Sequence, residues 1–205
     1  LNPGDASLHI PAAIEINGPL NLQHLQQAFN LLIAQHESLR TFFVDQGNNN
    51  QPVQQVVEHA AVTLEEDYDL SHLNAQQQQK HIQDILHDEA LSPFDLSASP
   101  CQQAPFIRVR LARCHPNNAP SDSQRFILFI CLHHIIADGT SIAILLQQLG
   151  SHYQNLQQYG RSSSTKNAID YIDFAAWQKQ WMQSDEQQQQ LAFWQKQCEG
   201  LAILQ

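Results

Sequence analysis

The stretch Phe126-Ile-Leu-Phe-Ile-Cys-Leu-His-His-Ile-Ile-Ala-Asp-Gly139 joins a long apolar run to a polar turn. An apolar run of this length that ends in a turn signal is typical of a strand buried on both faces. A helical pattern of apolar residues begins directly afterwards, at Thr140. The sequence therefore places His134 and Asp138 where a core strand becomes a loop and then a helix. From such a position a rigid scaffold can present an imidazole to a substrate.

Two adjacent histidines close this strand, and they cannot both face the same side of the sheet. Successive strand residues point to opposite faces. We therefore expect one imidazole to turn inward as a core group and the other to emerge. Of the two, His134 has a carboxylate four residues later, at Asp138. A turn histidine followed by a helix-capping Asp138 is the alternative interpretation, because this spacing also occurs by chance.

The residue types in this turn limit its chemistry. A neutral imidazole can accept a proton at cellular pH. Backbone N–H groups of Gly139, Thr140 and Ser141, at the start of the expected helix, could stabilise developing negative charge. The sequence has no G-x-S-x-G motif, and no serine or cysteine is suitably placed as a nucleophile. This favours direct attack of one substrate on another, assisted by His134, over a covalent enzyme intermediate.

Size and composition narrow the function classes. The 205 residues are enough for one domain with a real core, and the net charge of -10 argues against nucleic acid or an anionic membrane as the main partner. No stretch approaches the ~20 apolar residues of a membrane span, and no secretory signal is visible, so we expect a cytoplasmic protein. The first residue is Leu1 and not Met, so we expect a chain excised from a longer one.

Cysteine and histidine usage favours structural roles. None of the four cysteines has C-x-x-C spacing, and Cys131 falls in the expected core strand. We expect reduced structural thiols, since a buried free cysteine packs as a small apolar residue. The eleven histidines include no H-E-x-x-H and no Cys/His pair at finger spacing. We therefore expect no metal site.

Hydrophobic periodicity predicts interspersed strands and helices. Strands are expected at 8–16, 39–44, 53–57, 62–65, 106–111 and 126–132. Helices are expected at 22–33, 74–91, from 140 to 153, 169–183 and 185–199. Asn21 is a plausible N-cap, and the glutamine runs at 76–79 and 187–190 are expected on solvated helix faces. The fold class is α+β (mixed α/β), with a mixed sheet flanked by helices.

Several segments together resemble one family. His133-His-Ile-Ile-Ala-Asp-Gly139 resembles the HHxxxDG signature of nonribosomal peptide synthetase condensation domains, members of the chloramphenicol acetyltransferase-like superfamily. Four further matches occur in the family's order: Asn17–Asn21 with the helix after it, His36–Phe42 (RHExLRTxF), Pro93–Leu96 (PFDL) with Ile107–Leu111, and Tyr171–Gln178 (YxDFAxWQ) with the Phe193-Trp194 pair. Each match is weak alone, but their joint occurrence is specific and spans nearly the whole chain.

The resemblance implies an architecture. A complete condensation domain is a pseudo-dimer of two similar chloramphenicol acetyltransferase-like lobes, each a mostly mixed or antiparallel sheet flanked by helices. Residues 1–205 correspond to the N-terminal lobe, and the C-terminal lobe is absent. The family's active site lies in a tunnel at the lobe interface. We therefore expect the isolated lobe to be inactive.

The resemblance also implies a reaction. A donor thioester on an upstream peptidyl carrier protein meets an acceptor amine on a downstream one, and an amide forms. Both substrates arrive on 4'-phosphopantetheine arms, and the domain itself binds no cofactor. His134 would be catalytic, by deprotonating or positioning the amine. His133 and Asp138 would be structural, and Gly139 would permit close backbone approach.

The sequence departs from the family pattern at Gln35. The family's RHExLRTxF motif usually opens at this position with an arginine, which pairs with the signature aspartate. A contact of Gln35 with Asp138 cannot be a salt bridge, so Arg40 is the supporting residue expected to compensate. Arg108 is also a possible partner of Asp138, although surface solvation is its expected state. Trp177 and Trp181, spaced i, i+4, are expected to pack in the core.

Two alternatives stay open. An epimerization domain shares the HHxxxDG signature and moves a proton at the α-carbon, with His134 as one member of an acid–base pair. A non-catalytic relative would keep the fold and bind a carrier or another protein. The sequence Thr140-Ser141-Ile142 favours condensation over epimerization.

Overall fold

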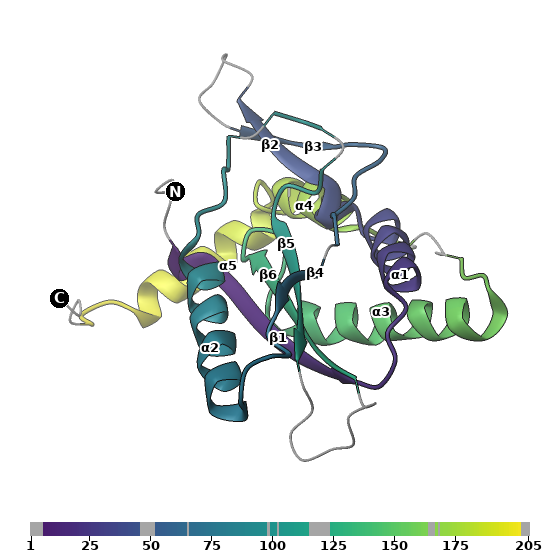
Figure 1. The fold of residues 1–205 in the computed structure, drawn as a ribbon. Coiled ribbons are helices and arrows are strands. Elements are labelled where there is room, and N and C mark those ends of the chain that lie inside the picture. Colours follow the sequence, from purple (N-terminus) through teal and green to yellow (C-terminus); the bar gives the residue numbers. More distant parts are fainter. Residues whose placement is uncertain are drawn as a thin grey trace. The chain divides into compact units, whose positions relative to one another are not determined.

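The computed structural model describes residues 6–45, 52–64, 66–97, 99–101, 103–114, 124–163, 167 and 169–201. The helices and strands, in chain order, are η1 (Ala6–Leu8), β1 (His9–Asn17), α1 (Leu22–Gln35), η2 (Glu37–Arg40), β2 (Thr41–Asp45), β3 (Pro52–Val56), β4 (Glu66–Asp69), α2 (Ala75–Leu91), β5 (Ile107–Cys114), β6 (Arg125–His133), α3 (Gly139–Tyr159), α4 (Tyr171–Trp181) and α5 (Asp185–Gln197) (Figure 1). The chain divides into a first unit, residues 1–167, and a second unit, residues 168–205.

The main sheet of the first unit has the strand order β1-β6-β5-β4. Strand β6 runs antiparallel to both of its neighbours, and β4 runs parallel to β5 at one edge. Every one of the nine residues of β6 is buried. The apolar run at 126–132 therefore forms an interior strand, and the predicted mixed sheet is confirmed.

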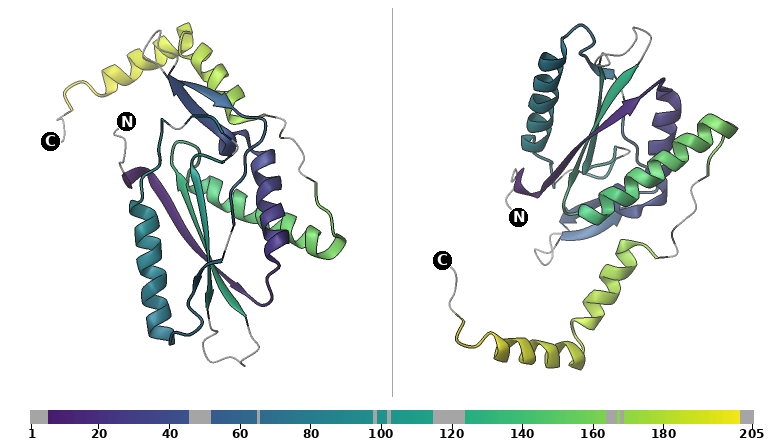
Figure 2. Two further views of the ribbon diagram at one scale, coloured as in Figure 1. Left: turned by 45° about the horizontal axis from the view of Figure 1, so that its top comes forward. Right: turned by 90° about the horizontal axis from the view of Figure 1, so that it is seen from below.

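Helices cover both faces of this sheet (Figure 2). Side chains of β6 at 126, 128, 130 and 132 pack in one core cluster with α1 and α3, through residues such as Phe29 and Leu149. Ile127 and Phe129 point the other way and pack with Ile82 and Ile85 of α2. The period of two along a strand thus sends alternate residues into two separate cores, which explains why the run lacks polar residues.

Strands β2 and β3 form a separate antiparallel hairpin. The predicted strand at 39–44 starts only at Thr41, because Glu37–Arg40 forms a 3-10 turn. The Thr41 hydroxyl donates to the Glu37 carbonyl (2.7 Å), which stabilises this turn. Residues 46–50, where the sequence Gln-Gly-Asn-Asn-Asn predicts a turn between these strands, lie outside the described residues.

The strand predicted at 62–65 is wrong. Residues 62–64 are not in a strand, and β4 begins at Glu66. The Gln26 side chain of α1 donates to the Val62 carbonyl and accepts from the Leu64 N–H, both at 2.8 Å. A side chain that is distant in sequence thus takes the backbone groups that a strand partner would use.

The glutamine run of α2 also differs from its prediction at one position. Gln78 is only 1% exposed. Its amide donates to the Leu73 carbonyl (3.0 Å), and its oxygen accepts from Arg125 (3.3 Å). Arg125 in turn pairs with Glu15 of β1 at 2.6 Å. One glutamine of the run therefore satisfies a buried arginine instead of facing solvent.

The second unit holds α4 and α5, and neither helix contains a buried residue in the part of the chain that the structure describes. The predicted core packing of Trp177 and Trp181 is wrong: their rings stack on each other (6.2 Å between centroids, 18°), but Trp177 is 56% exposed. Asp173 caps the start of α4, since its carboxylate accepts from the Asp170 N–H (3.0 Å).

The four cysteines are free thiols. Cys131 and Cys114 are buried, and burial raises the pKa of both thiols.

Among the described residues, none of the helices combines the length and apolar character that a membrane crossing requires. The same residues include no group of three or more His, Cys, Asp or Glu side chains arranged to bind a metal ion.

Candidate active site

His133 and His134 lie at the end of β6, and their side chains face opposite ways. His133 is 3% exposed, whereas His134 is exposed. The His133 N–H donates to the Phe106 carbonyl (3.0 Å), just before β5, and the His134 N–H donates to the Leu8 carbonyl (2.7 Å), just before β1. The expected split between an inward and an emerging histidine is confirmed, and both backbones are held by neighbouring segments.

His133 shapes the turn from inside the fold. Its Nδ1 accepts a hydrogen bond from the Ile135 N–H (3.0 Å), and its ring meets the rings of Phe94 (5.9 Å) and Phe106 (6.1 Å). Burial, followed by the charges of His9 and His134, lowers the pKa of His133 below its ordinary value. A buried, neutral imidazole that accepts a backbone N–H is suited to hold the turn and not to exchange protons with a substrate.

Asp138 caps α3. One carboxylate oxygen accepts from the Ser141 N–H (2.8 Å) and from the Ser141 hydroxyl (2.7 Å), and the Asp138 N–H donates back to that hydroxyl (3.1 Å). These bonds to Ser141 hold the pKa of Asp138 below its ordinary value, with smaller contributions from the Thr140 N–H and the charge of His134. Asp138 thus performs the capping role that the sequence left as an alternative.

This cap corrects one expectation about the turn. The Ser141 N–H donates to the Asp138 carboxylate, so it is not available to an oxyanion from a substrate. Gly139 has an ordinary backbone conformation, and a Cβ added there would meet nothing within 4 Å. The fold itself therefore does not require glycine at this position.

The residues expected to pair with Asp138 have other partners. Arg40 donates to the Val57 carbonyl and lies 3.5 Å from Glu37, so it stabilises the segment around the β2–β3 hairpin. The Gln35 side chain contacts His152 of α3 (3.3 Å). The expected support of Asp138 by Arg40 is therefore wrong, since Asp138 uses its carboxylate on its own helix.

Arg108 is not the solvated surface residue that the sequence suggested. It pairs with Glu89 of α2 (2.8 Å), donates to the Ser92 carbonyl (2.8 Å), and its guanidinium lies 3.9 Å from the centroid of the Phe94 ring. Arg108 thus joins β5 to the end of α2 and to the segment that follows it. This segment supplies the Phe94 ring that packs against His133.

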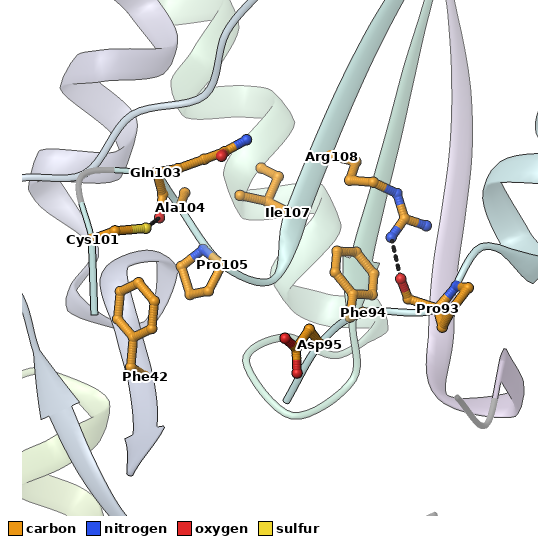
Figure 3. A pocket seen from close by; sticks show the side chains of 10 residues that line it. All are labelled: Phe42, Pro93, Phe94, Asp95, Cys101, Gln103, Ala104, Pro105, Ile107 and Arg108. Carbon is orange, nitrogen blue, oxygen red and sulfur yellow. Dashed lines mark hydrogen bonds between the residues drawn. The ribbon is translucent and has the colours of Figure 1, made fainter. Parts of the chain in front are cut away.

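A pocket of about 270 Å³ lies beside Phe94 (Figure 3). Its walls include Phe42, Phe94, Pro105 and Ile107, and Asp95 and Cys101 are among its polar and thiol groups. Sequence motifs alone did not predict this pocket. The signal that could have found it is that Phe42 and Phe94 belong to two of the family-like motifs, which the fold brings together.

Comparison with known proteins identifies the family. The family model described as "Condensation domain" matches residues 1–205. The chain belongs to the condensation domain family. It is 31% identical over 195 residues to a linear gramicidin synthase of Brevibacillus parabrevis, covering 95% of this chain and 2% of that protein. It is also 35% identical over 188 residues to gramicidin S synthase 2 of Brevibacillus brevis, covering 92% and 4%.

Solved structures agree with the fold of this condensation-family chain. A mutant of the starter condensation domain of the rhizomide synthetase RzmA superposes with a TM-score of 0.76 at 18% identity, covering 98% of this chain and 44% of that one. The X-domain in a complex with OxyB from teicoplanin biosynthesis gives a TM-score of 0.73 at 22% identity, covering 100% and 42%. The chain thus spans less than half of each solved chain and a few per cent of the synthetases.

Proposed function

We propose that this chain is part of a domain that forms amide bonds in nonribosomal peptide synthesis. An acceptor amine on a downstream peptidyl carrier protein attacks the thioester carbonyl of a donor on an upstream carrier protein. The new C–N bond forms, the thiol of the donor's 4'-phosphopantetheine arm leaves, and the amine loses a proton. The observation that carries this proposal is the family match over residues 1–205, with an exposed His134 at the signature.

His134 is the catalytic residue in this proposal. Its imidazole takes the amine's proton or holds the amine against the thioester. Proton transfer of this kind contributes ~10²–10⁴-fold, and well-oriented reactants reach effective molarities of ~10⁵–10⁸ M, so positioning can rival acid–base catalysis. Cys131, the thiol nearest in sequence, is buried with a raised pKa. This environment makes it a poor nucleophile and supports direct attack of amine on thioester.

A second lobe of the same domain completes the site. Two features support this part of the proposal: the related solved chains are more than twice as long as this one, and the second unit exposes large apolar side chains. These side chains on α4 and α5 are Tyr171, Phe174, Trp177, Leu191, Phe193 and Trp194. Exposed apolar surface of this extent is typical of an interaction face.

The test of His134 uses the intact domain with a loaded donor carrier and a loaded acceptor carrier. We expect His134→Ala to slow amide formation by ~10²–10⁴-fold with an unchanged melting temperature. The matched control is His59→Ala, since the His59 side chain is 82% exposed and lies away from the turn in sequence. Amide formation by His134→Ala at the wild-type rate would exclude this role for His134.

The same assay separates the alternatives. Deuterium uptake from solvent at the donor α-carbon without amide formation would indicate an epimerization domain. The chain 1–205 alone is expected to form negligible amide, and turnover at the rate of the intact domain would refute the need for a second lobe.

A protein-binding role is the second candidate function. It is favoured by the likeness of the fold to the X-domain, which was solved in complex with OxyB. Stable binding of a partner protein by the intact domain, combined with no turnover of loaded carriers, would support this candidate over catalysis.

A further inference from the structure

His9 begins β1 and stands opposite His133 in the pairing of β1 with β6. The residue before it, Leu8, supplies the carbonyl that accepts the His134 N–H at 2.7 Å. The two consecutive residues Leu8 and His9 therefore each meet one histidine of the signature. The position of this short segment sets where the backbone of His134 lies.

The His9 side chain fixes that segment to a helix. Its Nδ1 lies 2.7 Å from the Ala90 carbonyl, in the last turn of α2. A carbonyl oxygen can only accept, so Nδ1 of His9 carries the proton and donates. The bond also satisfies one of the carbonyls that every helix leaves unpaired at its C-terminal end.

The His9 ring fills the space between α2 and the His133 side chain. It meets the Phe94 ring edge-on (5.1 Å between centroids, 89°) and the His133 ring at 5.7 Å and 64°. His133, in turn, holds the Ile135 N–H through Nδ1. Two routes therefore run from His9 to the exposed histidine: one through the Leu8 carbonyl, and one through the packed rings and the turn.

We propose that His9 is a positioning residue for His134. Its Nδ1–H bond to Ala90 holds the start of β1 in place, and the Leu8 carbonyl transmits this position to the His134 backbone. The proposal rests on the proposed function only for its effect on catalysis. Its structural part concerns this chain alone and can be tested without any reaction.

The first measurement needs no variant. Long-range ¹H–¹⁵N correlation spectra of the histidine rings at pH 8 report which nitrogen carries the proton. We expect the proton of His9 on Nδ1 and the proton of His133 on Nε2. A proton on Nε2 of His9, with Nδ1 bare, would overturn the proposal, because the Ala90 carbonyl would then face another acceptor atom.

The second measurement compares two adjacent amides. In His9→Phe, which keeps an aromatic ring but loses the donor, we expect the His134 N–H to exchange with solvent roughly 10-fold faster. The His133 N–H is bonded to the opposite side, at Phe106, so its exchange should not change. His9→Asn places an amide nitrogen near the position of Nδ1 and should restore the His134 protection. Equal acceleration of both amides would show general loosening and would overturn the proposal.

The third measurement is kinetic and uses the intact domain. His9→Phe is expected to lower kcat by about 10- to 100-fold with KM unchanged, because a misplaced imidazole still allows the carriers to bind. His9→Asn should recover most of kcat. If His134→Ala abolishes turnover while His9→Phe keeps the wild-type kcat, the positioning role is refuted. If His134→Ala is fully active, the catalytic role of His134 fails, and amide exchange alone decides the role of His9.

Discussion

Helices rich in apolar residues occur in both units of the chain, but their apolar side chains are buried in only one of them. In the first unit, α1 buries five residues against the sheet (Leu25, Ala28, Phe29, Leu32 and Ile33). In the second unit, α4 carries aromatic and aliphatic residues at a density comparable with α1, and α5 carries fewer, but the described residues of both helices stay at least partly exposed. Periodicity thus shows which face of a helix is apolar, whereas the presence of a sheet or another partner decides whether that face is buried.

The largest expected difference between the units is in the cost of removing an aromatic ring. Phe129 of β6 is 1% exposed and packs against α2. Phe129→Ala should therefore lower the free energy of unfolding of this chain by about 3–5 kcal/mol. Trp177→Ala, on the exposed helix α4, should change it by less than about 0.5 kcal/mol. Urea unfolding measures both. An equally large loss for Trp177→Ala would mean that the α4 face is buried in solution and would erase the contrast.

The glutamine runs give the next test. Gln78→Ala removes the acceptor of the buried Arg125 guanidinium and should cost about 1–3 kcal/mol. Gln188→Ala, in the run on α5, replaces an exposed side chain and should be nearly neutral. Thermal and urea unfolding of the two variants provide the comparison. A neutral Gln78→Ala would indicate that Arg125 is satisfied by Glu15 alone.

The dependence of stability on pH should belong to the first unit, because all eleven histidines lie within residues 1–167. Burial lowers the pKa of His152, with a smaller effect from His36, and burial also lowers the pKa of His133. A base whose pKa is lower in the folded state binds fewer protons there than when unfolded, so the free energy of unfolding should fall as pH falls below about 6.5. The partners of His152, Gln35 and Ser162, are uncharged and do not offset its protonation.

His152→Gln is the matched variant for this effect, since an amide can keep hydrogen bonds to both partners without titrating. We expect a smaller loss of stability between pH 7.5 and 5.5 in urea unfolding than in the wild-type protein. An identical loss in the variant would assign the dependence to other histidines, with His133 first among them.

The smallest expected effect concerns helix caps. Asp138→Ala removes the cap of α3, a helix that packs in the main core, and should lower the melting temperature by roughly 2–4 °C. Ser184→Ala removes the cap of α5, which has no buried residue among those described, and should reduce helical circular dichroism without shifting the main transition. A shift of the same size for Ser184→Ala would show that α5 unfolds together with the sheet.

Much of the fold followed from local pattern. The interior strand β6, the five long helices and the cap at Asn21 agree with the sequence because periodicity and capping are local properties. The errors have a common physical cause in contacts between distant residues. The Gln26 side chain takes the backbone groups of the predicted strand at 62–65, and Arg125 draws Gln78 into the core.

The candidate site was predictable to a similar extent. Strand alternation at the end of a core strand correctly separated a buried His133 from an exposed His134. The sequence could not assign partners to Arg40 and Arg108, because Val57 and Glu89 come close only in the folded chain. His9 escaped notice for the same reason, since its hydrogen-bond partner is 81 residues away.

The place of β1 at the edge of the sheet has a consequence for shortened forms of the protein. Strand β1 covers one side of β6, the most apolar strand of the chain. Removal of residues 1–17 would make β6 an edge strand, with unpaired backbone N–H and C=O groups along the side that β1 now covers. An unpaired edge on an apolar strand recruits strands from other molecules, so such a shortened form should assemble into insoluble aggregates and not into a smaller folded domain.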